Sequence, residues 1–459
     1  MLMMKKLLRQ VRKETIDLPT HQRRKLWVMP FLRSYLVVLF AYTAMYLIRK
    51  NFNVSQNDLI EKFHFSKTDL ALIASAFSIP YGIGKTVVSY HADGKNTKNY
   101  ISILLILASI CMFGFGISAG SVGLMALFYG LNGFFQSAGG PTSYATLSRW
   151  APRKYRGTAL GCWNISHNLG GAMAATVATF GAQVFFDGDV RGMFIFPAII
   201  ACVIGILGLF IGSDSPEAYG LGRSEEIFEE KVSVEDQEVD THAHTKWQAF
   251  KRYVLFNPYI LALCFANIFV YIIRIGIDQW AVVYSKEVLG FSNEVAKSGF
   301  SYFETGAILS LLWGIFSDYL KGRRALTSII CLALVLVLIP AYQHATNPTM
   351  FHLSLFGLGF LIFGPQMLIG IAALNFVPKG AVGVADGVKG TFGYLVGDLF
   401  AKIGLGMMAD HKLTLFGLTG WQGTFGAMYI SVFLAILIMA YVAWGEENKI
   451  RQNQIRGIH

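Results

Sequence analysis

The chain contains the stretch Ala41-Tyr-Thr-Ala-Met-Tyr-Leu-Ile-Arg49-Lys-Asn-Phe52, in which an arginine follows a run of apolar and aromatic residues. The apolar run begins further upstream, so the whole segment covers residues 34–54. About 20 such residues are long enough to cross the hydrocarbon core of a membrane, which is ~30 Å thick. A charged side chain there costs about 2.5–3.5 kcal/mol at a helix centre, so Arg49 indicates a function.

The composition of the whole chain is typical of an integral membrane protein. Of its 459 residues, 54% are hydrophobic and only 15% are charged, which is more apolar surface than a water-soluble fold can bury. The formal net charge is +11, but the basic residues lie in short loops between apolar segments, which argues against binding to nucleic acid. The five cysteines show no paired spacing and are interpreted as core residues.

Twelve apolar segments long enough to span a bilayer can be drawn along the chain. Their predicted ranges are 34–54, 69–91, 99–118, 121–147, 157–185, 192–212, 257–284, 296–319, 325–344, 351–377, 381–409 and 419–445. The loops after the second, fourth and eighth segments are basic, at Lys95, Arg153 and Lys321, whereas the loop after the fifth carries Asp187 and Asp189. This bias places the basic loops and both chain termini in the cytoplasm.

The predicted organisation has five parts. They are a basic cytoplasmic N-terminal segment (1–33), an N-terminal six-helix half (34–212), a cytoplasmic linker (213–250), a C-terminal six-helix half (251–445) and a cytoplasmic tail (446–459). The first part carries nine Lys or Arg residues against two acids, and it is too long and too charged for a cleaved signal peptide. The linker is rich in acids, which we expect to keep it solvated.

The two halves repeat each other. Asp93 and Asp318 lie 225 residues apart in similar loops, and the same interval separates Arg49 from Arg274. At an offset of 226, several glycine, alanine and leucine positions from 157 to 171 also match positions from 383 to 397. We therefore predict an all-α membrane protein whose twelve transmembrane helices form two pseudo-symmetric six-helix bundles, with a binding site between them near the bilayer midplane.

Arg49 and Arg274 are the main candidates for a binding function. Each lies three residues after a tyrosine, in Tyr46-Leu-Ile-Arg49 and Tyr271-Ile-Ile-Arg274. Two arginines that face one cavity repel each other unless an anion lies between them, and guanidinium forks suit phosphate oxygens. Alternatively, each arginine extends to a lipid head group or pairs with an acid such as Asp278 or Glu304. The symmetric pair favours the anion site.

Further residues of the same segments complete the predicted site. Lys85 adds a positive charge, and His167 can donate a hydrogen bond to a phosphate oxygen or exchange a proton with it. Asp386 and Lys389 stand at positions i and i+3 and form a neutral pair that either stabilises its helix or lines the cavity. The aromatic members of the predicted site are Tyr42, Tyr46, Tyr81, Trp163, Tyr271 and Tyr394. A single histidine or tyrosine in such a helix often has only a packing role.

Three stretches carry a resemblance to a known family. The loops around Asp93 and Asp318, the latter with Arg323 and Arg324, resemble the cytoplasmic hinge signature of the major facilitator superfamily. The stretch 156–171 is similar to the signature of its organophosphate:phosphate antiporter family. The resemblance covers nearly the whole chain and is weakest in the linker and at the two ends.

The resemblance implies a transporter, and not an enzyme, in the bacterial cytoplasmic (inner) membrane. In this family a sugar phosphate is exchanged for inorganic phosphate by alternating access, and the phosphoryl group is bound by two arginines. By position that role falls on Arg49 and Arg274, with Lys85 and His167 in support. The implied partners are the two phosphate substrates and the lipid bilayer around a monomer, and neither a cofactor nor a metal is implied.

Two differences from the glycerol-phosphate branch of the family bear on the substrate. Gly140 stands where that branch has a tryptophan, and Asp386 and Lys389 stand where that branch is uncharged. Both differences indicate a hexose phosphate, and glucose 6-phosphate is the expected one.

Two other classes of function stay open at this point. A sugar-phosphate receptor branch shares the fold and the arginine pair, although it lacks the charged pair matched by Asp386 and Lys389. A membrane enzyme that acts on the phosphate needs a nucleophile or metal cluster near the arginines, and the sequence shows no such constellation.

Overall fold

The computed structural model describes residues 7–92, 95–230, 256–373, 376 and 388–455. Within these ranges the regular structure is helical, apart from an isolated β-bridge between Leu415 and Leu418. The chain divides into two compact units, one made of residues 1–62 and 76–236 and the other of residues 63–75 and 237–459.

Eight of the described helices are long and apolar enough to cross a membrane. They are α2 (Thr20–Val54), α5 (Thr97–Ile117), α10 (Gly192–Phe210), α14 (Pro258–Glu287), α17 (Arg324–Gln343), α18 (Pro348–Ala373), the segment Val388–Ala409, and α21 (Gly420–Ile455). The other four predicted segments coincide with α4 (Lys67–Ala92) and with three pairs of shorter helices. These pairs are α6 (Val122–Gln136) with α7 (Gly139–Trp150), α8 (Arg153–Asn164) with α9 (Ser166–Phe185), and α15 (Asn293–Leu309) with α16 (Leu311–Tyr319).

The described parts of all twelve predicted segments are mainly helical, with short turns at some ends and at 137–138, Ile165 and Ser310, which confirms the predicted fold class. The predicted segments and the observed helices differ mainly in where they begin and end. Helix α2 begins 14 residues before the predicted start at residue 34, and the short α3 (Gln56–Phe63) follows it directly. The basic N-terminal segment is thus partly an extension of the first spanning helix.

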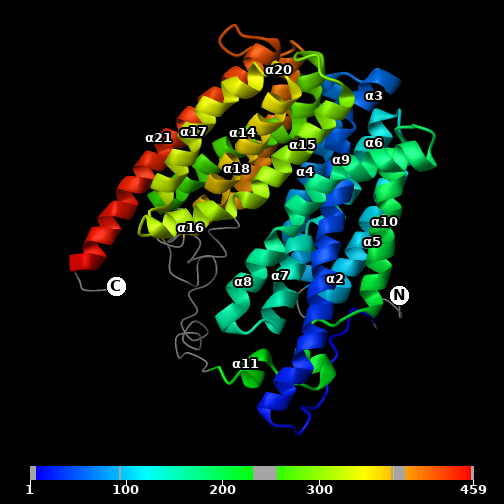
Figure 1. The fold of residues 1–459 in the computed structure, drawn as a ribbon, viewed down its shortest axis with the longest axis vertical. Coiled ribbons are helices and arrows are strands. Elements are labelled where there is room, and N and C mark those ends of the chain that lie inside the picture. The colour runs from blue at the N-terminus through cyan, green and yellow to red at the C-terminus, as the bar shows by residue number, and fades with distance from the viewer. Residues whose placement is uncertain (1–6, 93–94, 231–255, 374–375, 377–387, 456–459) are drawn as a thin grey trace. The chain divides into compact units, whose positions relative to one another are not determined.

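Helix α2 lies at the centre of the first unit. It packs against α9 and α10 and also touches α5 and α7, while α5 packs against α10 and α6 (Figure 1). The approach of α9 to α2 depends on Gly170, because a Cβ atom there would collide with the backbone carbonyl of Thr43. Small residues at such crossings let helix backbones approach closely within a membrane.

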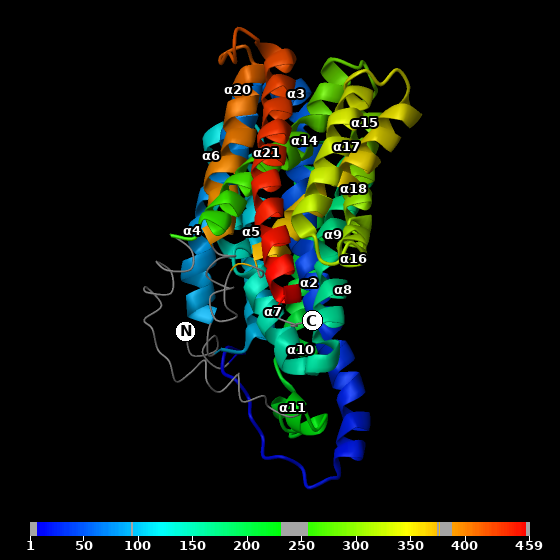
Figure 2. The same ribbon diagram turned by 90° about the vertical axis from the view of Figure 1, so that its left-hand side faces the viewer.

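Helix α14 has the corresponding place in the second unit. It packs against α21, α15 and α18, and α17 packs against α18 and α21 (Figure 2). The eleventh predicted segment runs beside α14 and is irregular, since two π-helical pieces, η4 (Gly393–Asp398) and η5 (Phe400–Gly404), precede α20 (Leu405–Ala409). Gly397 permits this contact, because a Cβ there would lie 2.7 Å from the side chain of Tyr271. Wide π-helical turns are frequent at functional sites.

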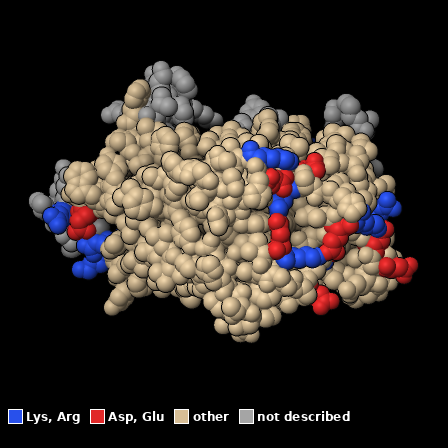
Figure 3. Space-filling view, turned by 90° about the horizontal axis from the view of Figure 1, so that it is seen from above, with Lys and Arg blue, Asp and Glu red and all other residues tan. Residues whose placement is uncertain are grey.

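The outward faces of the helices carry large apolar side chains. Helix α10 exposes Ile199, Val203, Leu207 and Phe210, which lie three or four residues apart and so share one face. Such an apolar face suits a lipid environment. Seen from above (Figure 3), lysine, arginine, aspartate and glutamate lie in a few groups of mixed sign.

The first part of the predicted linker is folded. It contains η1 (Pro216–Tyr219) and α11 (Ser224–Ile227), and Leu221 and Ile227 are buried. Arg24 of α2 donates a hydrogen bond to the carbonyl of Ile227 and forms an ion pair of 3.3 Å with Glu229. Residues 213–230 therefore pack on the first unit, and Glu229 has a protein partner. Residues 231–250 lie outside the described residues.

Candidate functional site

Arg49 lies among three aromatic rings of the first unit. The guanidinium carbon of Arg49 is 4.4 Å from the ring centroid of Phe77, 4.9 Å from that of Tyr81 and 5.3 Å from that of Tyr46. Phe77 and Tyr81 are one turn apart on α4, and their rings stack with centroids 5.4 Å apart. Cation–π contacts in a desolvated setting contribute up to about 2 kcal/mol. Because aromatic rings carry no net charge, these contacts hold the guanidinium without neutralising it.

The other predicted residues of the first unit join the same group. The Nζ atom of Lys85 lies 5.6 Å from the ring centroid of Tyr81. Ring contacts continue from Tyr46 to His167 at 5.3 Å, from Tyr46 to Tyr42 at 5.3 Å, and from Tyr42 to Trp163 at 4.8 Å. The structure thus connects all seven predicted site residues of this unit, which are Tyr42, Tyr46, Arg49, Tyr81, Lys85, Trp163 and His167.

Two of these residues, Trp163 and His167, also make contacts that are typical of side chains with a packing role. Trp163 is buried in a core cluster with Val38 and Leu147. The Nδ1 atom of His167 lies against the carbonyl oxygen of Asn164, one turn earlier. If Nδ1 carries the proton in this contact, the other ring nitrogen, Nε2, is an acceptor suited to proton exchange.

Arg274 has a similar setting in the second unit. Its guanidinium carbon is 4.4 Å from the ring centroid of Phe363 on α18 and 5.8 Å from that of Tyr271 on its own helix. The ring of Tyr271 meets that of Tyr394 edge-on, with centroids 5.2 Å apart. Each arginine therefore has a tyrosine three residues earlier on its own helix and a phenylalanine of a neighbouring helix at 4.4 Å.

The predicted pair of Asp386 and Lys389 is only partly described. The backbone carbonyl of Lys389 accepts a hydrogen bond of 3.0 Å from the Nδ2 atom of Asn267 on α14. This contact ties the first described turn of the eleventh segment to the helix that carries Arg274. Asp386 lies outside the described residues.

Acids are buried in the second unit together with Arg274. Asp278, one turn after Arg274 on α14, is buried, and so is Glu304 of α15. Asp398 and Lys402, at positions i and i+4, form a buried ion pair with a distance of 2.9 Å. Because the charge of a buried arginine is felt strongly in a medium of low dielectric constant, an acid one turn away, such as Asp278, moderates its field.

The predicted hinge residues take part in ion pairs at the ends of helices. Arg324 contacts Asp318 at 3.3 Å, and Arg323 donates two hydrogen bonds, of 2.9 and 3.2 Å, to the carboxylate of Glu447 on α21. The neighbouring Glu446 is buried and accepts a hydrogen bond of 2.8 Å from the backbone N–H of Ala325. Two acids of α21 thus hold the beginning of α17. Asp93 lies outside the described residues.

Sequence reasoning missed the phenylalanine next to each arginine. For Phe77 a signal exists, because Phe77, Tyr81 and Lys85 are spaced four residues apart and so share one face of α4. For Phe363 no comparable spacing exists. Its contact with Arg274 depends on how α18 packs against α14.

The sequence matches a known protein family and known proteins of similar length. The family model described as Major Facilitator Superfamily matches residues 38–401. The chain is 57% identical over 452 residues to the hexose-6-phosphate:phosphate antiporter of Salmonella typhimurium and 58% identical over 452 residues to that of Escherichia coli K12. In both cases the match covers 97% of each chain.

Among solved structures, the chain resembles a bacterial homologue of the human lysosomal transporter Spinster in an inward-facing and unoccupied conformation. The TM-score is 0.67 at 17% sequence identity, and the match covers 91% of this chain and 97% of that one. At this level of identity the likeness shows the fold.

Proposed function

The chain belongs to the organophosphate:phosphate antiporter family of the major facilitator superfamily, and on this basis we propose that it takes up a hexose 6-phosphate in exchange for inorganic phosphate. Glucose 6-phosphate is the proposed sugar phosphate. Relatives that match nearly the entire chain carry this activity in their names.

The observation that carries the proposal is the repeated setting of Arg49 and Arg274. Both arginines lie in helices that are long and apolar enough to cross a membrane, and the guanidinium group of each contacts an aromatic ring. A membrane protein keeps two such costly charges at corresponding positions when they bind an anion. The guanidinium fork and the phosphoryl group match in geometry and in charge, so the two arginines are the proposed phosphate ligands.

The same charges explain why transport requires a bound substrate in each direction. Without an anion, the positive charges of Arg49, Arg274 and Lys85 oppose closure of the carrier around an empty site. A phosphate dianion removes that penalty. To raise the population of the closed conformation from about 1% to 99%, the anion must favour it by roughly 5.5 kcal/mol, which two charge-assisted bidentate contacts can supply.

Around the arginines, neighbouring side chains have supporting roles in the proposal. Lys85 contributes a third positive charge, and His167 donates a hydrogen bond or exchanges a proton with the phosphate. Tyr42 and Tyr46 form walls beside the phosphoryl group. Asp386 and Lys389 contact the sugar part, where hydroxyl groups need both donors and acceptors.

The lack of a side chain at Gly140 favours a large substrate. A Cβ atom at this position would lie 3.4 Å from the hydroxyl of Tyr42, so any larger side chain would extend against a member of the proposed site. Glycine leaves that space for a substrate bulkier than glycerol phosphate.

The proposed setting is the bacterial cytoplasmic membrane, where the protein acts as a monomer surrounded by lipid. The basic loops favour a cytoplasmic location for both termini. A protease or impermeant label applied from each side of sealed membranes tests this orientation. Modification of the N-terminal segment from the periplasmic side would show that it is wrong.

The substrate is tested with purified protein in liposomes loaded with inorganic phosphate. Uptake of labelled glucose 6-phosphate is measured in competition with unlabelled hexose 6-phosphates, triose phosphates and glycerol 3-phosphate. Hexose 6-phosphates are expected to compete at the lowest concentrations. Stronger competition by glycerol 3-phosphate would overturn the assignment of the sugar, and binding without uptake would indicate a receptor instead of a carrier.

A further inference from the structure

Helix α6 holds the backbone of α2 at Arg49. The hydroxyl of Tyr129 donates a hydrogen bond of 2.8 Å to the carbonyl oxygen of Arg49, and the Nδ2 atom of Asn132 donates one of 3.5 Å to the carbonyl of Ile48. Gln136 in turn donates a hydrogen bond of 2.8 Å to the Oδ1 atom of Asn132. Tyr129, Asn132 and Gln136 are all buried and lie on one face of α6.

These bonds occur close to the end of α2. The helix ends at Val54, five residues after Arg49, and its last residues, among them Phe52 and Val54, are buried. A carbonyl oxygen has two lone pairs, so it can accept the hydroxyl of Tyr129 in addition to its helical N–H. The bonds from α6 therefore restrain the α2 backbone at Arg49 without breaking the helix.

The ring of Tyr129 makes a second connection to the same arginine. Its centroid lies 5.0 Å from that of Phe77, which is the ring closest to the guanidinium of Arg49. The Tyr129 ring is also fixed on its other sides by Phe52 at 5.2 Å and Phe115 at 5.4 Å. One side chain thus contacts the backbone of Arg49 directly and its charged end through Phe77.

We propose that Tyr129 is a positioning residue that sets the orientation of Arg49 for phosphate binding. The inference rests on the proposed function, because it assumes that Arg49 binds the phosphoryl group. Two parallel hydrogen bonds from one guanidinium require that its plane be aligned with the phosphate oxygens. Tyr129 supplies this alignment from α6 and does not itself bind the substrate.

The test is the substitution Tyr129→Phe, which removes the hydroxyl and keeps the ring. The apparent KM for inorganic phosphate in exchange assays is expected to rise about 3- to 10-fold, the usual effect of one lost hydrogen bond. The maximal rate is expected to change less than KM, since the closing motion is unaffected. Equilibrium binding of inorganic phosphate to the purified protein should weaken by the same factor.

Tyr284→Phe is the matched control. The hydroxyl of Tyr284 also donates to a backbone carbonyl, that of Gln343 at 2.9 Å, and Tyr284 is as buried as Tyr129. Tyr284 lies ten residues beyond Arg274 on α14, outside the proposed site. If Tyr284→Phe raises the KM for phosphate as much as Tyr129→Phe does, the effect is a general loss of packing and the inference is wrong.

A double substitution separates positioning from a merely structural role. In an Arg49→Lys background no guanidinium fork remains to be aligned, so adding Tyr129→Phe should leave the KM for phosphate unchanged. A further increase of the same size in that background would overturn the inference. If Tyr129→Phe does not yield folded protein, Asn132→Ala replaces it with the same expected outcomes, because it removes the donor to Ile48.

Failure of this inference and failure of the proposed function give different results. If the unmodified protein does not exchange phosphate at all, the proposed function is wrong. If it exchanges phosphate and Tyr129→Phe has an unchanged KM, the function stands and Tyr129 does not position Arg49.

Discussion

At the scale of single residues, the proposed phosphate binding depends on two arginines that contact aromatic rings. Phe77 and Phe363 each lie 4.4 Å from a guanidinium carbon, so each arginine packs against an uncharged aromatic ring. This combination suits a ligand that brings its own negative charge. Lysine in place of arginine would keep the charge and lose the planar fork.

Arg49→Lys and Arg274→Lys should therefore each lower the rate of phosphate exchange about 10- to 100-fold, which is the usual effect of losing a charge-assisted hydrogen bond. The measurement is exchange of labelled phosphate by each variant in liposomes, at equal amounts of inserted protein. Rates close to those of the unmodified protein would show that the arginines are not phosphate ligands.

Gly140→Trp tests the space beside Tyr42. The new side chain would extend against the Tyr42 hydroxyl, so the KM for glucose 6-phosphate should rise about 10-fold or more, while exchange of the smaller inorganic phosphate should change less. Gly123→Trp serves as the control, because a Cβ there meets no atom within 4 Å. A uniform loss for both substrates would argue against a role in selecting the sugar.

Much of the candidate site could be predicted from residue types and spacing. Arg49 and Arg274 were detectable because each is a charge in an apolar segment and the two are 225 residues apart. The restraint by Tyr129 could not be predicted in this way, because it joins residues of two helices 80 positions apart. Such contacts depend on the packing of α2 against its neighbours, which periodicity does not specify.

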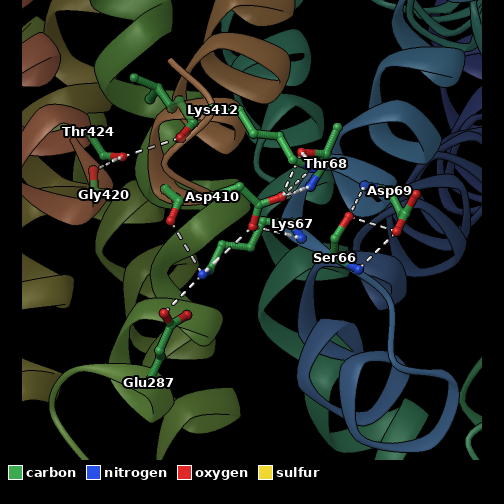
Figure 4. A network of polar contacts seen from close by, with 11 residues as sticks. Ser66, Lys67, Thr68, Asp69, Glu287, Asp410, Lys412, Gly420 and Thr424 are labelled. Carbon is green, nitrogen blue, oxygen red and sulfur yellow. Dashed lines mark hydrogen bonds and ion pairs between the residues drawn. The ribbon is translucent and has the colours of Figure 1, made fainter. Parts of the chain in front are cut away.

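At the scale of secondary-structure elements, the beginning of α4 shows how one helix is fixed by another part of the chain. Asp410, which directly follows α20, accepts hydrogen bonds from the backbone N–H groups of Lys67 and Thr68, at 3.2 and 2.7 Å, and from the Thr68 hydroxyl at 2.6 Å (Figure 4). Lys67 also contacts Glu287 of α14 at 2.9 Å. Carboxylates at helix N-termini satisfy unpaired N–H groups and interact favourably with the helix dipole.

Asp410→Asn should therefore destabilise the protein by about 1 kcal/mol, the usual cost of weakening a helix cap. The expected result is a lower apparent melting temperature in detergent. Asp187→Asn is the control, because Asp187 is exposed in a loop. An equal melting temperature for Asp410→Asn and the unmodified protein would show that this cap contributes nothing to stability.

The same carboxylate predicts a dependence on pH. Burial raises the pKa of Asp410, but hydrogen bonds from Thr68 and the charge of Lys412 outweigh this effect, so the pKa lies below its ordinary value. The stabilisation is therefore complete above the pKa of an unfolded aspartate, about 3.9, and is lost as the pH falls through the lower pKa of the folded state.

The difference in melting temperature between the unmodified protein and Asp410→Asn should thus stay constant from about pH 8 to pH 5 and shrink below about pH 4. A difference that already disappears near pH 6 would mean that the pKa of Asp410 is raised, and would contradict the described hydrogen bonds.

At the scale of the whole molecule, the fold was largely predictable and the packing of the loops was not. The twelve apolar segments were visible because the bilayer requires long apolar helices, and each is mainly helical where described. The linker 213–250 was expected to stay solvated because it is rich in acids. In its described part Glu226 and Glu229 are exposed, whereas Leu221 and Ile227 are buried and Glu229 pairs with Arg24, contacts that composition does not reveal.

The proposed transport is an exchange, in which the protein moves phosphate compounds in both directions and does not transport them singly. The most direct test compares liposomes loaded with inorganic phosphate with liposomes loaded with sulfate, both diluted into medium that contains labelled glucose 6-phosphate. The account predicts rapid accumulation of label in the phosphate-loaded liposomes and very little in the others, because an empty site cannot return. Equal accumulation in both, or none in either, would contradict it.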